Sequence, residues 1–329
     1  MMPHSTVPLV RRFSPVPKSG TDEVQEEIAG LFRASRPAGW EQIELKHRCV
    51  ILAGAGAGKT HEMLARAKYA SERERHAFFI RIEDLGEGFE DAFEVGDAKG
   101  FQRWLDGQNE GWFFLDSIDE ARLSHPRAFE RAIRRFANRI KGAEHRAHVI
   151  VSGRPYAWRA VTDRAMLERL LPFAAPKVGV EGSEGSEADQ NSELVQKDIT
   201  KPESELEIHM LSDLDEGDIR MFAAHRDANN IEELIAELYR SNLMALAARP
   251  HDLLGILAKW AADSSLGSRY EFLRYGIDDQ LREIDPSRAQ LQPLSPEKAL
   301  SGARLLAAAV VLTGEPGLRV PDSEHSEQG

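Results

Sequence analysis

The amino-acid sequence predicts a mixed α/β protein in which a parallel sheet is followed by a helical domain. Short runs of bulky apolar residues alternate with helical patterns between about residues 48 and 153, as expected when helices connect parallel strands. Beyond Ile219 the pattern is wholly helical. The first apolar run opens directly into a glycine-rich stretch, which indicates where this sheet carries its function.

Length and composition limit what the chain can be. Its 329 residues suffice for one large domain and a smaller one. Asp and Glu number 54 against 42 Lys and Arg, and the net charge of −12 repels phosphate backbones and acidic membranes. We therefore expect neither nucleic acid nor a membrane as a partner. The single cysteine, Cys49, and the lack of a recognisable signal peptide lead us to expect a cytoplasmic protein.

A glycine-rich motif lies at the centre of the predicted sheet. Residues 50–52 (VIL) predict a short buried strand, residues 53–60 (AGAGAGKT) a loop, and residues 61–67 a helix. This is the order of a phosphate-binding loop, in which backbone N–H groups and a helix N-terminus face an anion. Lys59 would neutralise the β- and γ-phosphates of a nucleotide, and Thr60 would hold Mg²⁺.

The predicted nucleotide-binding residues of this loop are Ala53, Gly54, Ala55, Gly56, Ala57, Gly58, Lys59 and Thr60. Ala53 stands where the G-x-x-x-x-G-K-[ST] pattern has its first glycine, and alanine is held more strictly than glycine to negative φ. The alternative is a turn of small residues that binds nothing. The complete Gly-Lys-Thr ending favours phosphate binding.

A second motif lies at residues 112–121 (WFFLDSIDEA). Its bulky apolar residues predict a buried parallel strand whose carboxyl end carries Asp116. Beside a phosphate-binding loop, such a carboxylate binds Mg²⁺, usually through water. The plainer interpretation is a strand followed by an acidic helix start. Because loop and strand supply complementary halves of one Mg-phosphate site, we assign Thr60 and Asp116 to the metal.

Further elements surround these motifs. Residues 77–82 and 148–153 predict buried strands, and Arg154 follows the second of them at the same edge of the sheet. The segment around residues 129–140 predicts a helix with one apolar stripe, and its other faces carry Arg127, Arg131, Arg134, Arg135 and Arg139. We interpret these arginines as a solvated face, rather than as a patch for nucleic acid or an acidic partner or as a source of an arginine finger.

The chain divides by composition into a flexible arm (1–20), a helical lead-in (21–45), the α/β core (46–215), a helical lid domain (216–313) and a flexible tail (314–329). Within the core, the polar stretch at about 177–205 predicts a disordered insertion, and residues 206–211 a last strand. The site of such a sheet opens at the carboxyl ends of its strands. We therefore expect the helices that follow the last strand to cover a bound nucleotide as a lid.

Three stretches together resemble the NACHT family, which are STAND-class, AAA+-related P-loop NTPases used as signalling and defence switches. They are residues 53–60, residues 113–120 (FFLDSIDE) and residues 151–155 (VSGRP). The second is the most specific, because it resembles that family's series of Asp, small residue, apolar residue, Asp and Glu. The third is similar to the family's sensor strand, with Gly153 in place of its usual serine. The resemblance covers about residues 40–260.

The resemblance implies roles for individual residues. Asp119 and Glu120 become candidates to orient or deprotonate the attacking water, and the choice between them stays open. Arg154 would sense or stabilise the charge of the γ-phosphate. Residues 242–250 look like the family's lid segment, which makes Pro250 a candidate contact of the nucleotide base; the alternative is a proline that merely starts or breaks a helix.

The expected function is therefore that of a Mg²⁺-dependent P-loop NTPase that binds and hydrolyses ATP, or GTP. It would act as a nucleotide-controlled signalling or defence switch through a protein partner or self-assembly. One alternative is a nucleotide-gated interaction module with little or no turnover. A P-loop kinase is a weaker alternative, because the sequence shows no dedicated acceptor-site motif.

Overall fold

The computed structural model describes residues 9–16, 37–86, 88–124, 127–173, 206–282 and 295–314. The predicted insertion at 177–205 lies outside the described residues, as do residues 21–36 of the predicted lead-in and most of the predicted arm and tail. The chain forms two compact units: Met1–Ile231 with Ala245–Leu254, and Glu232–Met244 with Gly255–Gly329.

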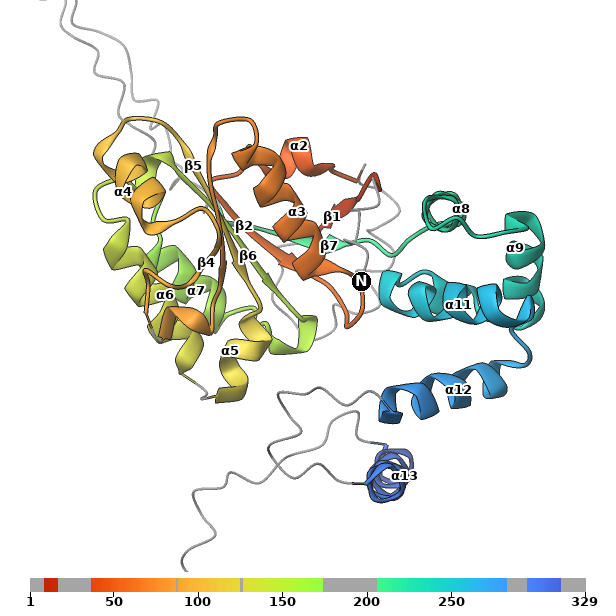
Figure 1. Ribbon diagram of the computed structural model, residues 1–329. Helices are drawn as coiled ribbons and strands as arrows, with labels where there is room; N and C mark the ends of the chain where they lie inside the picture. Colours follow the sequence, from red (N-terminus) through yellow and green to blue (C-terminus); the bar gives the residue numbers. More distant parts are fainter. Residues whose placement is uncertain are drawn as a thin grey trace, which may run out of the picture. The chain divides into compact units, whose positions relative to one another are not determined.

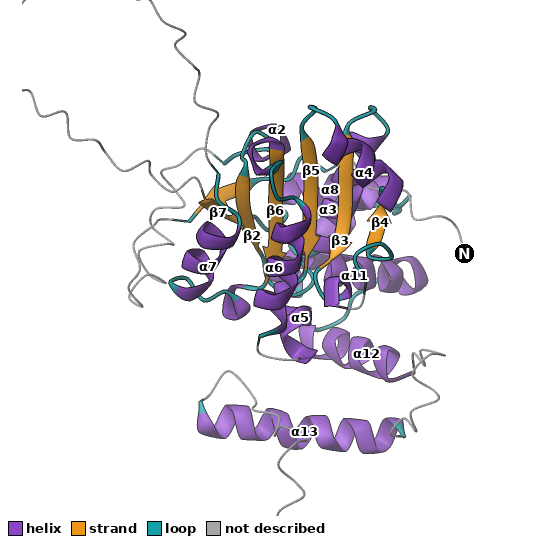
Figure 2. Ribbon diagram, turned by 90° about the vertical axis from the view of Figure 1, so that its left-hand side faces the viewer, coloured by secondary structure: helices purple, strands orange, loops and turns teal. Residues whose placement is uncertain are grey.

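The first unit is built on a sheet whose strands are β1 (Phe13–Pro15), β2 (Arg48–Leu52), β3 (His76–Arg81), β4 (Phe93–Val95), β5 (Gly111–Asp116), β6 (Ala147–Gly153) and β7 (Leu206–Leu211). The seven strands lie in the order β1-β7-β2-β6-β5-β3-β4. Figure 1 shows the sheet edge-on, and Figure 2 shows β7, β2, β6, β5, β3 and β4 side by side from left to right. The five central strands are parallel, while β1 and β4 pair antiparallel at the edges. The predicted mixed α/β class with a mostly parallel sheet is confirmed.

The helices of this unit are α2 (Trp40–Ile43), α3 (Lys59–Ser71), α4 (Ala98–Asp106), α5 (Ile118–Ser124), α6 (Ala128–Arg139), α7 (Thr162–Leu170) and α8 (Glu216–His225), with most of α10 (Met244–Ala247), the start of α11 (Pro250–Asp263), and the 3₁₀ turns η1 (Asp84–Gly86), η2 (Glu144–Arg146) and η3 (Pro155–Ala157). Helices α2 and α3 pack on one face of the sheet, and α4 to α7 on the other (Figure 2).

Two apolar cores therefore flank the sheet. In β2, Val50 and Leu52 pack towards α4 to α7, whereas Cys49 and Ile51 pack towards α2 and α3. Side chains alternate between the faces of a strand, so a strand covered on both faces must be apolar throughout. Each fully buried Val, Leu, Ile or Phe stabilises the fold by about 1.5–3 kcal/mol relative to exposure. Burial on both faces is therefore why the strands that precede the glycine-rich loop and end at Asp116 are continuous apolar runs.

The sheet order locates a site at the carboxyl ends of β2 and β6. These strands are neighbours and run parallel. The chain leaves β2 towards α3 on one face and leaves β6 towards α7 on the opposite face. Connections that diverge in this way open a crevice beyond the strand ends, which is where open α/β sheets bind ligands.

A strand lies inside the predicted flexible arm. Phe13, Ser14 and Pro15 form β1, which pairs with β7. Phe13 is fully buried and packs edge-on against Trp40, with 4.8 Å between the ring centroids. Pro15 is tolerated because β1 is an edge strand. Three residues are too few to establish a hydrophobic period, so the sequence pattern predicted no structure here.

The described residues of the second unit form helices joined by short loops. They include most of α9 (Ile231–Arg240), the rest of α11, α12 (Arg269–Arg282) and α13 (Pro296–Thr313). Helix α8 and residues Ala245–Leu254, which the sequence analysis placed in the lid domain, cluster with the sheet in the first unit. No described helix is both long and apolar enough to cross a membrane.

Candidate functional site

The glycine-rich loop leaves β2 and enters α3. Ala53 is fully buried, and its N–H donates to the carbonyl of Gly153, 3.1 Å away, which ties the loop to β6. Positive φ occurs in the loop at Gly56 (74°) and Gly58 (87°), where a side chain would be strained. Ala53 keeps an ordinary φ. The alanine that departs from the sequence pattern therefore stands at a position that does not need glycine.

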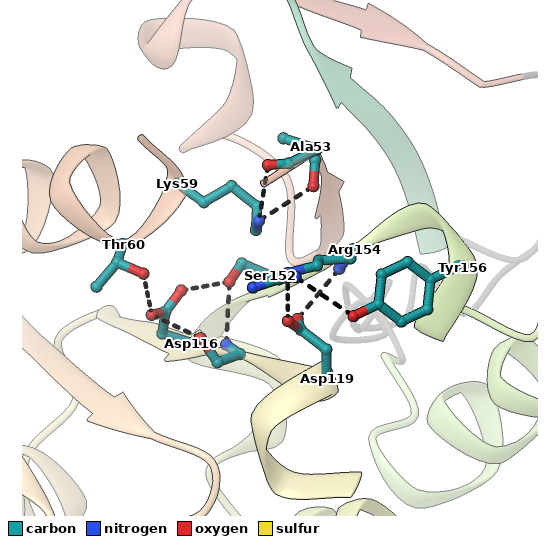
Figure 3. Close-up of polar contacts among 10 residues, drawn as sticks. Ala53, Lys59, Thr60, Asp116, Asp119, Ser152, Arg154 and Tyr156 are labelled. Carbon is teal, nitrogen blue, oxygen red and sulfur yellow. Dashed lines mark hydrogen bonds and ion pairs between the residues drawn. The ribbon is translucent and has the colours of Figure 1, made fainter. Parts of the chain in front are cut away.

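Helix α3 starts immediately after Gly58, which is its N-cap. The first N–H groups of a helix have no acceptor within it, and the helix dipole places partial positive charge at this end. The amine of Lys59 folds back to donate to the carbonyls of Ala53 (3.0 Å) and Gly54 (3.4 Å), as Figure 3 shows. Burial lowers the pKa of Lys59, and the Asp119 carboxylate opposes that shift. The start of the helix therefore carries both partial and full positive charge.

Asp116 ends β5 and is completely buried. Its carboxylate accepts hydrogen bonds from the hydroxyls of Thr60 (2.7 Å), Ser117 (3.1 Å) and Ser152. The Ser152 hydroxyl also accepts from the N–H of Ser117, 3.1 Å away. Ser117 has φ 70°, unusual for a residue with a side chain. Two serines thus hold the carboxylate, and Thr60 joins it to the glycine-rich loop.

The oxygens of Thr60 and Asp116 suit a hard cation. Magnesium prefers oxygen ligands, keeps several waters and takes only one or two carboxylates from a protein. Among the described residues, no group of three or more His, Cys, Asp or Glu side chains is placed to hold a metal ion. Thr60 and Asp116 offer one hydroxyl and one carboxylate, which fits a Mg²⁺ ion that keeps most of its waters.

Asp119, in the first turn of α5, is bound to Arg154. One carboxylate oxygen accepts from the Arg154 N–H (3.2 Å), and the other lies 2.7 Å from its Nε (Figure 3). Asp119 is 8% exposed, and the side chain of Arg154 is 36% exposed and also reaches the Tyr156 hydroxyl (3.4 Å). The side chain of Glu120, by contrast, makes no hydrogen bond or ion pair with the residues that the structure describes. The neighbouring carboxylates therefore differ: one is engaged and one is not.

Gly153 stands where the resembling sensor strand usually has a serine, and its packing explains this difference. A Cβ built on this residue would lie 3.1 Å from both Cβ and Cδ1 of Ile118. That distance is shorter than ordinary van der Waals contact, so a serine here would have to displace the first residue of α5. The glycine lets α5 pack directly against the end of β6.

A cavity of about 370 Å³ lies over this end of the sheet, within the first unit. Of the predicted site residues, those in its lining are Ala55, Gly56, Gly58, Lys59, Thr60, Asp119, Glu120, Arg154 and Pro250. Asp116 is buried behind Thr60, and Ala53 and Ala57 are buried as well. The structure thus brings the three sequence motifs together around one cavity.

Several lining residues were not predicted from the sequence. Apolar side chains in the lining come from Leu9, Phe222 and Leu254 as well as from Pro250. His251 packs on the loop: its N–H donates to the carbonyl of Gly56 (3.2 Å). These residues come from three separate segments, and their local patterns are those of ordinary helices and of an aperiodic arm, so no sequence signal marked them.

The polar lining can bind an anion and a cation next to each other, and the apolar lining can cover a flat ring. No protein-family model and no curated protein matches the chain. The function proposed for this site therefore depends on its own geometry.

Proposed function

We propose that this chain is a Mg²⁺-dependent P-loop NTPase that binds and hydrolyses ATP or GTP, of the NACHT type within the STAND class. The observation that carries the proposal is the contact of 2.7 Å between the Thr60 hydroxyl and the Asp116 carboxylate. The hydroxyl begins a helix after a glycine-rich loop, and the carboxylate ends a parallel strand. Together they are the two halves of a Mg-phosphate site.

The loop would bind the phosphates. The N–H groups and the positive dipole end at the start of α3 favour an anion there, and Lys59 adds the full charge. Its amine now contacts the backbone carbonyls of Ala53 and Gly54, from which it can turn to a phosphate oxygen. When bound by Thr60 and Asp116, Mg²⁺ would neutralise charge on the phosphate oxygens. Ser117 and Ser152 would keep the Asp116 carboxylate in the orientation for this task.

The geometry favours Glu120 over Asp119 as the general base. Both oxygens of Asp119 are used by Arg154, whereas Glu120 lines the cavity and its carboxylate has no bonded partner among the described residues. In hydrolysis a water oxygen would bond to the γ-phosphorus while the bond from that phosphorus to the β-γ bridging oxygen breaks. Glu120 would take the proton from that water.

The nucleotide base would lie against the apolar lining. Pro250 and Leu254 contribute to the cavity, and we propose Pro250 as the base contact. The protein would act as a nucleotide-controlled signalling or defence switch. Its output would be a conformational change that alters binding to a protein partner or self-assembly.

One observation favours the alternative of a binding module with little turnover. Arg154, the cation that would stabilise charge developing on the γ-phosphate, is held by Asp119 through its backbone and its side chain. If this pairing persists with nucleotide bound, the site lacks a cation that hydrolysis needs.

Phosphate release from Mg-ATP and Mg-GTP by the purified full chain tests the proposal. Mg²⁺-dependent release that disappears in Glu120→Gln supports the NTPase. Saturable binding of Mg-nucleotide without release supports the module. Absence of binding by either nucleotide, in folded protein with Mg²⁺ present, contradicts both.

A further inference from the structure

Two consecutive carbonyls of the glycine-rich loop are held by groups from outside β2 and α3. The N–H of His251 donates to the Gly56 carbonyl at 3.2 Å. The next carbonyl, of Ala57, accepts from Nη2 of Arg11 at 3.0 Å. The loop's conformation is therefore set partly by segments distant in sequence.

Fixing a carbonyl also fixes the N–H that follows it. In a planar trans peptide the C=O of one residue and the N–H of the next point in opposite directions, and no cis peptide bond occurs in the described chain. When Arg11 draws the Ala57 carbonyl to one side, it turns the Gly58 N–H to the other. Gly58 is the N-cap of α3, next to Lys59, so its N–H belongs to the group that would face a phosphate.

The side chain of Arg11 is buried and is held by several contacts. It is 3% exposed, and Nη2 also donates to the Ser212 carbonyl, 3.2 Å away, just beyond the end of β7. Its Nε lies 3.9 Å from the carboxylate of Glu62 in the first turn of α3. Burial lowers the pKa of Arg11, and Glu62 is the first of the charges that oppose the shift. One guanidinium thus links the loop, the last strand and the helix.

We infer that Arg11 is a positioning residue of the phosphate-binding loop, acting through the Ala57 carbonyl to orient the Gly58 N–H towards the anion. The inference rests on the proposed function. It makes the segment from Leu9 to Pro15, whose last three residues pair with β7 as an edge strand, a part of the anion site and not only of the sheet.

Arg12 provides a matched control on the same segment. It is paired with Asp215 (2.7 Å) and Asp218, which cap α8, and its side chain is 37% exposed. Among the described residues it makes no hydrogen bond to the loop. Arg12→Met therefore loosens the segment without releasing the Ala57 carbonyl, whereas Arg11→Met does both.

The test measures binding of Mg-ATP and of Mg-pyrophosphate to the full chain by calorimetry, well below the unfolding temperature of each variant. Pyrophosphate probes the phosphate site without a base. Arg11→Met should weaken both ligands about tenfold to a hundredfold, the effect of losing one hydrogen bond from a charged group. Arg11→Lys, which keeps the charge and one donor, should recover part of the loss, and Arg12→Met should bind like the parent.

Three results would overturn the inference: unchanged pyrophosphate affinity in Arg11→Met, an equal loss in Arg11→Met and Arg12→Met, or no difference between Arg11→Met and Arg11→Lys. Should Arg11→Met not fold, Arg11→Lys against Arg12→Met is the decisive pair. If the parent binds neither ligand, the proposed function fails, and amide exchange in ligand-free protein tests Arg11 alone. Faster exchange of the Gly58 amide in the Arg11 variants than in Arg12→Met supports its role, and equal exchange contradicts it.

Discussion

Thr60 and Asp116 are 56 positions apart in the chain, yet the hydroxyl of one lies 2.7 Å from the carboxylate of the other. The sheet order explains the contact. Strands β2 and β5 both flank β6 and run parallel to it, so the loop after β2 and the last residue of β5 reach the same edge. A loop that would bind phosphate and a carboxylate that would bind Mg²⁺ are thereby fixed one strand apart.

Mutation of Asp119 and mutation of Glu120, the two carboxylates of α5, should have different effects. Glu120→Gln should bind Mg-ATP like the parent and lose about 10²–10⁴ in turnover, because an amide keeps the shape but cannot accept the proton. Asp119→Asn should instead release Arg154, because the amide no longer carries the charge that pairs with its Nε. Binding and single-turnover hydrolysis are to be measured for both variants. Parental turnover in Glu120→Gln would remove this residue from the proposed mechanism.

Two glycines of one loop should differ in their tolerance of alanine. Gly58 has φ 87°, so Gly58→Ala forces a left-handed conformation that costs about 1–2 kcal/mol and should distort the start of α3. Gly54 has no heavy atom within 4 Å of an added Cβ and keeps an ordinary φ, so Gly54→Ala should behave like the parent. Urea unfolding and Mg-ATP titration of both variants check this. Equal losses of stability and of Mg-ATP affinity in the two variants would show that the left-handed backbone at Gly58 is not the cause of the loss.

Gly153 and Ile118 should be energetically coupled. Gly153→Ser forces a side chain to within 3.1 Å of Ile118 and should destabilise the fold by about 1–3 kcal/mol, the cost of overpacking. Ile118→Ala vacates part of that space. In a double-mutant cycle followed by urea unfolding, the pair should therefore cost less than the sum of the single changes, by about 0.5 kcal/mol or more. Strict additivity would mean that this contact does not select glycine.

The free energy of unfolding should fall at low pH because of two histidines at the amino ends of β2 and β6, the end of the sheet opposite the cavity. His47 stacks between His148 and Phe173, with ring centroids 4.2 Å and 3.8 Å away. Burial, with a smaller effect of His148, lowers the pKa of His47 from 6.5 to about 4, and burial also lowers that of His148. The unfolded chain then binds more protons than the folded one between these values. The contribution of neutral, buried His47 to the free energy of unfolding is fully present above pH 6.5 and is lost as the pH falls towards 4.

The matched variant for this effect is His47→Phe, which retains a ring for stacking and cannot titrate. Urea unfolding at pH 7 and pH 5 should show a larger loss for the parent than for His47→Phe. The comparison is needed because carboxylates with lowered pKa values, such as Glu207, also lose stabilising interactions as the pH falls. Identical losses in the two proteins would show that His47 does not titrate as described.

Local sequence patterns sufficed for the central strands and for the three motifs at their carboxyl ends. The runs before Ala53, Asp116 and Arg154 are apolar because both faces of the sheet are covered, and parallel strands bring their ends to one edge. The edge strands β1 and β4 have three residues each, too few to show a period.

Contacts across the fold could not be predicted in the same way. Arg11 reaches Ser212 over 201 positions, and Ser152 reaches Asp116 over 36. Neither side chain stands out in its local sequence: Arg11 belongs to an aperiodic arm, and Ser152 is the next-to-last residue of β6. Likewise, the pairing that separates Asp119 from Glu120 depends on where η3 follows β6, which spacing alone does not determine.

Titration of the purified chain with Mg-ATP, alongside Lys59→Ala and Lys68→Ala, tests the central claim most directly. Both lysines lie on α3, but Lys59 lines the cavity and Lys68 is exposed in the last turn of the helix. Circular dichroism and unfolding temperatures establish that each variant is folded. The proposed function predicts saturable binding in the parent and in Lys68→Ala, and loss of tight binding in Lys59→Ala. Unchanged affinity in folded Lys59→Ala would contradict it.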